Sequence, residues 1–140
     1  MLRDRLREVR ARIERAAARA GRSADQITLV AVTKLFPASA IQEAYALGVR
    51  DFGENYVQEF EGKHPAVEAL EGARFHLIGH LQSNKARRAA EIFQVIETVD
   101  SSKLARRLNE MARPLEVMLE VKLAEEQAKS GAAPGEVPAL

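Results

Sequence analysis

The chain has no cysteine, little net charge and no long apolar run among its 140 residues. Without cysteine it has no disulfide framework, thiol nucleophile or thiolate metal site, which fits a reducing compartment. A net charge of +1 gives no general reason to bind nucleic acid or acidic membranes. No apolar run approaches the about 18 residues that span a bilayer, and the first ten residues lack a secretory apolar core. We therefore expect a cytoplasmic protein with one domain, no nucleic-acid partner and no membrane association.

The first segment predicts an amphipathic helix that Gly21 is well placed to end. Its arginines are interspersed with Asp4, Glu8 and Glu14, so we interpret them as a solvated face in preference to a nucleic-acid patch. The apolar stripe recurs at spacings of three and four residues: Leu2, Leu6, Val9, Ile13, Ala16, Ala17 and Ala20.

Beyond this helix, apolar strand patterns alternate with helix patterns five times. The predicted strands cover 27–33, 49–53, 74–79, 94–99 and 115–123, the last being the longest. The predicted helices cover 38–48, 56–72 (interrupted at Gly62 and Pro65), 83–93 and 100–112. Such alternation is typical of a parallel sheet with right-handed crossovers.

A doubly wound sheet and a TIM-type (β/α)₈ barrel both fit this alternation. A barrel needs roughly 200 residues or more, so this chain would hold about five of its eight strands. The last residues, "KSGAAPGEVPAL", predict a loop entering a new helix near Pro134. We expect a truncated barrel or fragment.

Lys34 ends the first strand, where parallel folds keep their functional groups. Strand alternation places Lys34 on the face of Val30 and Val32, so its amine can point into a barrel. A desolvated lysine is a nucleophile that condenses with aldehydes to a Schiff base. Periodicity alone favours the alternative, a lysine whose head reaches water.

The next strands also end in polar residues. Asn55 offers both a donor and an acceptor to a ring hydroxyl or an imine, whereas Glu54 is more typical of a cap than of a base. His76 lies in an apolar strand and is more typical of a hydrogen-bonded core residue than of a ligand. Gly79 breaks the helical spacing between His76 and His80, so we expect no metal site.

Five segments occur in order and carry a resemblance: "AVTK", "FGENYVQE", "FHLIGHLQSNK", "VDS" and "EEQAKSG". Together they resemble the pyridoxal phosphate homeostasis protein family over nearly the whole chain. The resemblance implies the (β/α)₈ barrel of the alanine racemase N-terminal domain, with residues 1–140 as the N-terminal part of one cofactor-binding domain. It also implies pyridoxal 5′-phosphate as cofactor, with Lys34 forming the Schiff base, Asn55 beside it, and His76, Ile78 and Gly79 lining the pocket.

The resemblance further implies a role in intracellular pyridoxal phosphate homeostasis without an established catalytic reaction, so no residue is assigned as catalytic. Pyridoxal phosphate-dependent apoenzymes would be partners, and full-length relatives would be monomers or weak dimers. The family's phosphate-binding loops lie beyond residue 140, which predicts weak binding with little discrimination between pyridoxal and its phosphate. The fifth strand departs from the family's usual Val-Asn ending with Val121 and Lys122.

Two other classes of function stay open at this point. One is a racemase-like enzyme that uses Lys34 as its base, although the sequence offers no convincing second acid–base group. The other is an interaction module that assembles with another chain and binds no cofactor. Visible absorbance of a Schiff base would separate the module from the other two, and alanine racemisation would indicate the enzyme.

Overall fold

A computed structural model describes residues 1–125 and 130–140 of the chain. Residues 126–129, which belong to the "EEQAKSG" segment, lie outside the described residues. The described part contains one parallel sheet of five strands in sequence order: β1 (Val30–Val32), β2 (Asp51–Glu54), β3 (Arg74–Leu77), β4 (Val95–Val99) and β5 (Glu116–Leu119). A doubly wound sheet reverses its strand order at a switch point, so the observed order is that of a barrel.

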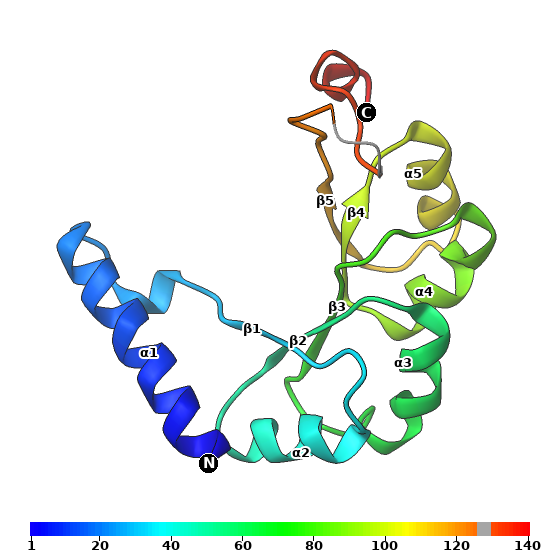
Figure 1. The fold of residues 1–140 in the computed structure, drawn as a ribbon. Helices are drawn as coiled ribbons and strands as arrows, with labels where there is room; N and C mark the ends of the chain where they lie inside the picture. Colours follow the sequence, from blue (N-terminus) through cyan, green and yellow to red (C-terminus); the bar gives the residue numbers. More distant parts are fainter. Residues whose placement is uncertain (126–129) are drawn as a thin grey trace.

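Helices follow the strands, as the alternation predicts, and α2 to α5 lie along one face of the sheet (Figure 1). Helix α1 precedes β1 and stands apart from that row. No helix within the described residues combines the length and apolar character that crossing a membrane requires. The α-helices are α1 (Leu2–Arg19), α2 (Ala38–Ala46), α3 (Val57–Lys63), α4 (Ala86–Ile92) and α5 (Ser102–Asn109). The 3₁₀ turns are η1 (Ala24–Gln26), η2 (His64–Ala66), η3 (Ser83–Lys85) and η4 (Pro134–Ala139).

Aromatic side chains form the centre of the core between the sheet and these helices. Phe60 of α3 lies 4.7 Å from Phe75 of β3 and 4.8 Å from Phe93, measured between ring centroids. Phe52 of β2 stacks on Phe75 at 5.8 Å. Phe52, Phe60 and Phe93 are fully buried. This packing fixes β2, β3 and α3 relative to one another.

The strand register assigns the other face of the sheet to a different set of residues. Val32, Gly53 and His76 are partners across β1, β2 and β3. Because side chains alternate along a strand, Phe52 and Phe75 point toward the helices while Gly53 and His76 lie on the opposite face. That opposite face is the interior of a barrel.

Most predicted elements are longer than the observed ones, as β1, β5 and α3 illustrate. Strand β1 covers only residues 30–32, with Thr33 adding one more ladder bond from its N–H to the Gly53 carbonyl. Strand β5 covers four residues, so the prediction that it is the longest strand is wrong. Beyond it, Val121 forms an isolated bridge with Ala132. Helix α3 ends at Lys63 because Pro65 opens a separate 3₁₀ turn.

The two edge strands, β1 and β5, expose apolar side chains on the described surface. Val32, Val117, Met118 and Leu119 are between 41% and 52% exposed. Uncovered edges and apolar patches of this kind favour association. We predict that the 140-residue chain elutes larger than a monomer and binds a hydrophobic dye. Size-exclusion chromatography with light scattering tests this; a monomeric peak with cooperative unfolding and no dye binding would contradict it.

Candidate functional site

Lys34 lies in a tight turn directly after the last ladder bond of β1. The Phe36 N–H donates to the Thr33 carbonyl at 3.1 Å and closes this turn. Leu35 adopts a positive φ of 65°, a backbone region that a leucine rarely occupies. The Lys34 side chain is exposed, so the described residues do not supply the desolvation expected for it. The carboxylates of Glu54 and Glu59 beneath this turn pair with Lys63 and not with Lys34.

Asn55 and Gly79 are brought together at the ends of β2 and β3. A Cβ added at Gly79 would lie 2.1 Å from the Asn55 carbonyl oxygen, so only glycine permits this approach. The Ile78 N–H donates to the Glu54 carbonyl at 2.9 Å and continues the ladder to this point. The Asn55 Oδ1 atom is buried and has no hydrogen-bond partner among the described residues. An unpaired buried acceptor is costly, so this atom is one that a bound donor would satisfy.

Ile78 packs on the interior face beside β1. A Cβ added at Gly53 would lie 3.1 Å from Ile78 Cδ1 and 3.3 Å from a Val30 methyl. Val32 lies at 3.5 Å from the same point. Val30, Val32 and Ile78 therefore form one apolar surface on the interior face, across Gly53. Val30 and Val32 lie on the same face of β1, as the sequence predicts.

His76 is buried on the interior face, two residues before Ile78 along the same strand. Its Nδ1 lies 2.7 Å from Glu97 Oε1 and its Nε2 lies 2.8 Å from Asp51 Oδ1. Both ring nitrogens are thus occupied, and His76 is a buried, hydrogen-bonded residue of the interior face.

Sequence reasoning missed a buried ionic cluster beneath the Lys34 turn, on the helix side of the sheet. Glu54 is fully buried, and its carboxylate accepts from the Thr33 hydroxyl at 2.7 Å and from Lys63 Nζ at 3.0 Å. Lys63 also pairs with Glu59 at 2.6 Å. The signal in the sequence was the spacing of Glu59 and Lys63, four residues apart on one helix face. Glu54 is therefore a structural ion-pair partner. This agrees with the expectation from the sequence that Glu54 does not act as a base.

Glu59 also carries a shifted pKa. Burial raises the pKa of its carboxyl, but hydrogen bonds from Lys63 and from the Leu35 N–H outweigh burial and lower the pKa below its ordinary value. A carboxyl with a lowered folded-state pKa stabilises the fold above its unfolded pKa, and this stability is lost as the pH falls through the folded value.

We therefore predict that Glu59→Gln lowers the free energy of unfolding at neutral pH and that its difference from the parent chain shrinks in acid. The difference should begin to close near the ordinary glutamate pKa of about 4.3. Denaturant unfolding at a series of pH values measures it, with the exposed Glu43→Gln as matched control. A difference that stays constant with pH would contradict the assignment.

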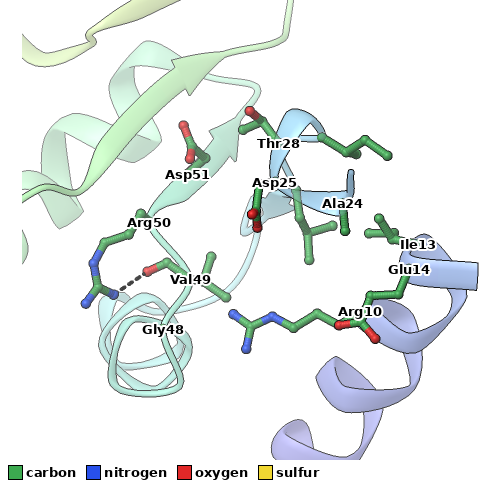
Figure 2. Close-up of a pocket in the computed structure, with 12 residues that line it drawn as sticks. Arg10, Ile13, Glu14, Ala24, Asp25, Thr28, Gly48, Val49, Arg50 and Asp51 are labelled. Carbon is green, nitrogen blue, oxygen red and sulfur yellow. Dashed lines mark hydrogen bonds between the residues drawn. The ribbon is translucent and has the colours of Figure 1, made fainter. Parts of the chain in front are cut away.

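A hollow of about 360 Å³ lies at the opposite end of the strands. Figure 2 shows Arg10 and Glu14 of α1 across this hollow from Asp25, whereas the Arg50 side chain turns away and donates to the Val49 carbonyl at 2.9 Å. The Arg10 guanidinium donates to the Leu47 carbonyl at 3.2 Å. Because the hollow lies at the amino ends of β1 and β2, it is separate from the turn of Lys34.

The amino-acid sequence matches a known family over nearly its whole length. Residues 5–140 match the family model described as alanine racemase, N-terminal domain. The chain therefore belongs to the family of the alanine racemase N-terminal domain, and its fold is a truncated (β/α)₈-type barrel with five parallel strands. Both the predicted family resemblance and the predicted fold are confirmed.

Curated relatives share the name pyridoxal phosphate homeostasis protein. That of Pseudomonas aeruginosa is 46% identical over 141 residues, which covers 98% of this chain and 61% of the relative. That of Escherichia coli K12 is 46% identical over 132 residues, which covers 90% of this chain and 56% of the relative. The chain thus spans less than two thirds of the length of these relatives.

Solved structures of PipY from Synechococcus elongatus have the same fold. The structure with pyridoxal phosphate bound has a TM-score of 0.75 and 42% identity, and covers 91% of this chain and 62% of PipY. The structure without the cofactor has a TM-score of 0.78 and 44% identity, and covers 91% of this chain and 61% of PipY.

Proposed function

We propose that this chain binds pyridoxal 5′-phosphate as a Schiff base on Lys34. The observation that carries the proposal is the convergence of an available amine at Lys34 and an unsatisfied acceptor at Asn55 on the carboxyl ends of β1 and β2. Asn55 Oδ1 suits a hydroxyl or imine donor on the cofactor, and Ile78, Gly79 and His76 would line the adjoining interior face. The structure of PipY with pyridoxal phosphate bound, at 42% identity, supports binding of this cofactor.

For this function the protein has to supply an amine for the Schiff base and groups that bind and orient the cofactor. The neutral amine of Lys34 attacks the aldehyde carbon, a C=N bond forms and one water molecule leaves. When bound, the cofactor supplies an electron-withdrawing ring. Asn55 would orient that ring through its free acceptor, and Ile78 would exclude water from its apolar side.

The proposed role is that of a carrier or regulator in intracellular pyridoxal phosphate homeostasis, without catalysis. The names of the relatives support this role. Cytoplasmic location and transfer of the cofactor to dependent apoenzymes belong to the same proposal. A racemase-like enzyme would use the same lysine, so assay of alanine racemisation by the loaded chain distinguishes it from a carrier.

The decisive experiment traps the Schiff base. We expect the chain mixed with pyridoxal phosphate to absorb in the visible, and borohydride to deliver hydride to the C=N bond and leave a stable secondary amine. Peptide mapping should place the pyridoxyl group on Lys34. Lys34→Ala should abolish the label, whereas Lys103→Ala, an exposed lysine on α5, should retain it. Labelling of Lys85 or Lys122 instead, or no visible band, would refute the proposal.

A further inference from the structure

The two peptide groups that flank Lys34 are both held by charged side chains from α3. The Thr33 carbonyl accepts from Lys63 Nζ at 3.0 Å. The Leu35 N–H donates to Glu59 Oε1 at 2.6 Å. These two peptides set the φ and ψ angles of Lys34, because they are the planes on either side of its Cα.

The side chains that bind this turn are themselves held in place by buried hydrogen bonds and ion pairs. Lys63 is buried, and its ammonium lies within 3.1 Å of oxygens of Thr33, Glu54 and Glu59. An ammonium has three protons, so these partners use its whole donor capacity. Glu54 is fully buried and is locked to Thr33 by the hydroxyl bond at 2.7 Å. Long side chains that are fully engaged in a low-dielectric setting have little freedom to move.

The turn needs such support. Leu35 is held at a φ of 65°, where its Cβ is crowded, and conformations of this kind persist only when surrounding contacts over-determine them. The Glu59 carboxylate contacts the N–H of this strained residue directly. Without that bond, the turn would relax toward backbone angles that a leucine prefers, and Lys34 would move with it.

We propose that Glu59 and Lys63 are positioning residues that fix the backbone of Lys34 and thereby aim its amine at the cofactor. This inference rests on the proposed function of Lys34. It also gives the two lysines different roles: Lys63 is fully engaged by carboxylates and a carbonyl, and Lys34 is the reactive one. Neither Glu59 nor Lys63 needs to touch the cofactor.

The test uses Glu59→Ala first, because the Glu59 side chain is 24% exposed whereas Lys63 lies deeper. In the isotope-labelled chain we expect amide hydrogen exchange at Leu35 to accelerate by about tenfold or more, the factor of one lost charge-assisted hydrogen bond. The dissociation constant of pyridoxal phosphate, read from the visible band, should rise by about the same factor because the amine is no longer aimed. Glu59→Gln keeps an acceptor oxygen and should largely rescue both readouts, while Glu43→Ala should change neither.

Lys63→Met provides the second arm, with exposed Lys103→Met as its matched control. If this variant is folded, its cofactor affinity should also fall and its label should stay on Lys34. A folded Glu59→Ala with parental exchange at Leu35, or with faster exchange but unchanged affinity, would overturn the positioning role. If the parent chain gives no reducible adduct, the proposed function fails. Amide exchange at Leu35 in Glu59→Ala then tests the backbone role of Glu59 by itself: faster exchange supports it, and unchanged exchange refutes it.

Discussion

Gly79→Ala is expected to destabilise the fold by about 3 kcal/mol, near the upper end of what overpacking costs. The new Cβ would lie 2.1 Å from the Asn55 carbonyl oxygen and 2.8 Å from its carbon. The obstacle is backbone at the end of β2, so no side-chain rotation relieves it. Either β2 and β3 separate at their ends or the Asn55 segment shifts, and both changes disturb the candidate site. Denaturant unfolding measures the loss, and the visible band of added pyridoxal phosphate should weaken in parallel.

Gly62→Ala is the matched control for this prediction. Gly62 lies in α3, and a Cβ there would meet nothing within 4 Å. Alanine is a better helix former, so this change should leave stability unchanged or raise it by up to about 1 kcal/mol. Equal effects of the two substitutions would show that the approach of Gly79 to Asn55 is not the constraint described above.

Phe60→Ala is expected to cost about 3–5 kcal/mol of unfolding free energy, the range for removing a buried aromatic ring. Phe60 is fully buried, and its ring packs at a tilt against both Phe75 and Phe93. Its loss opens a cavity between α3 and the sheet. A small domain is stable by only about 5–15 kcal/mol, so a large share of the fold's stability should disappear.

The comparison for Phe60 is Phe36→Ala, which removes the same ring from the surface. Phe36 is 59% exposed, so its replacement should change the unfolding free energy by less than about 0.5 kcal/mol. Thermal and denaturant unfolding of both variants test the contrast. A mild effect at Phe60 would mean that the core between α3 and the sheet repacks around the missing ring.

The sequence predicted the elements well where a pattern is local. The strand that contains Phe75 and His76 follows from the apolar pattern of residues 74–79. The lengths of the edge strands were not predictable in this way. Val117 and its neighbours in β5 have a strand-like composition, but ladder bonds depend on a partner strand, which sequence pattern does not reveal.

In the candidate site, too, residues at strand ends were predictable, whereas residues that depend on contacts between elements were not. Strand ends identified Lys34 and Asn55 because a parallel sheet gathers them at one edge. The partners of His76 could not be found, because Asp51 and Glu97 meet it only through the register of three strands. Lys63 was missed as well: a lysine on an α-helix is normally solvated, and its burial depends on Glu54 from another element.

The sequential strand order has a consequence for how the chain is made. Each strand after β1 pairs with the strand that preceded it in synthesis, so none of these pairings waits for a distant partner. The loop to be closed at each step is one helix and its connections, which keeps the entropy of closure small. Each strand–helix unit can therefore dock on the previous one as it leaves the ribosome, and β1 with β2 provides the template on which the later units assemble.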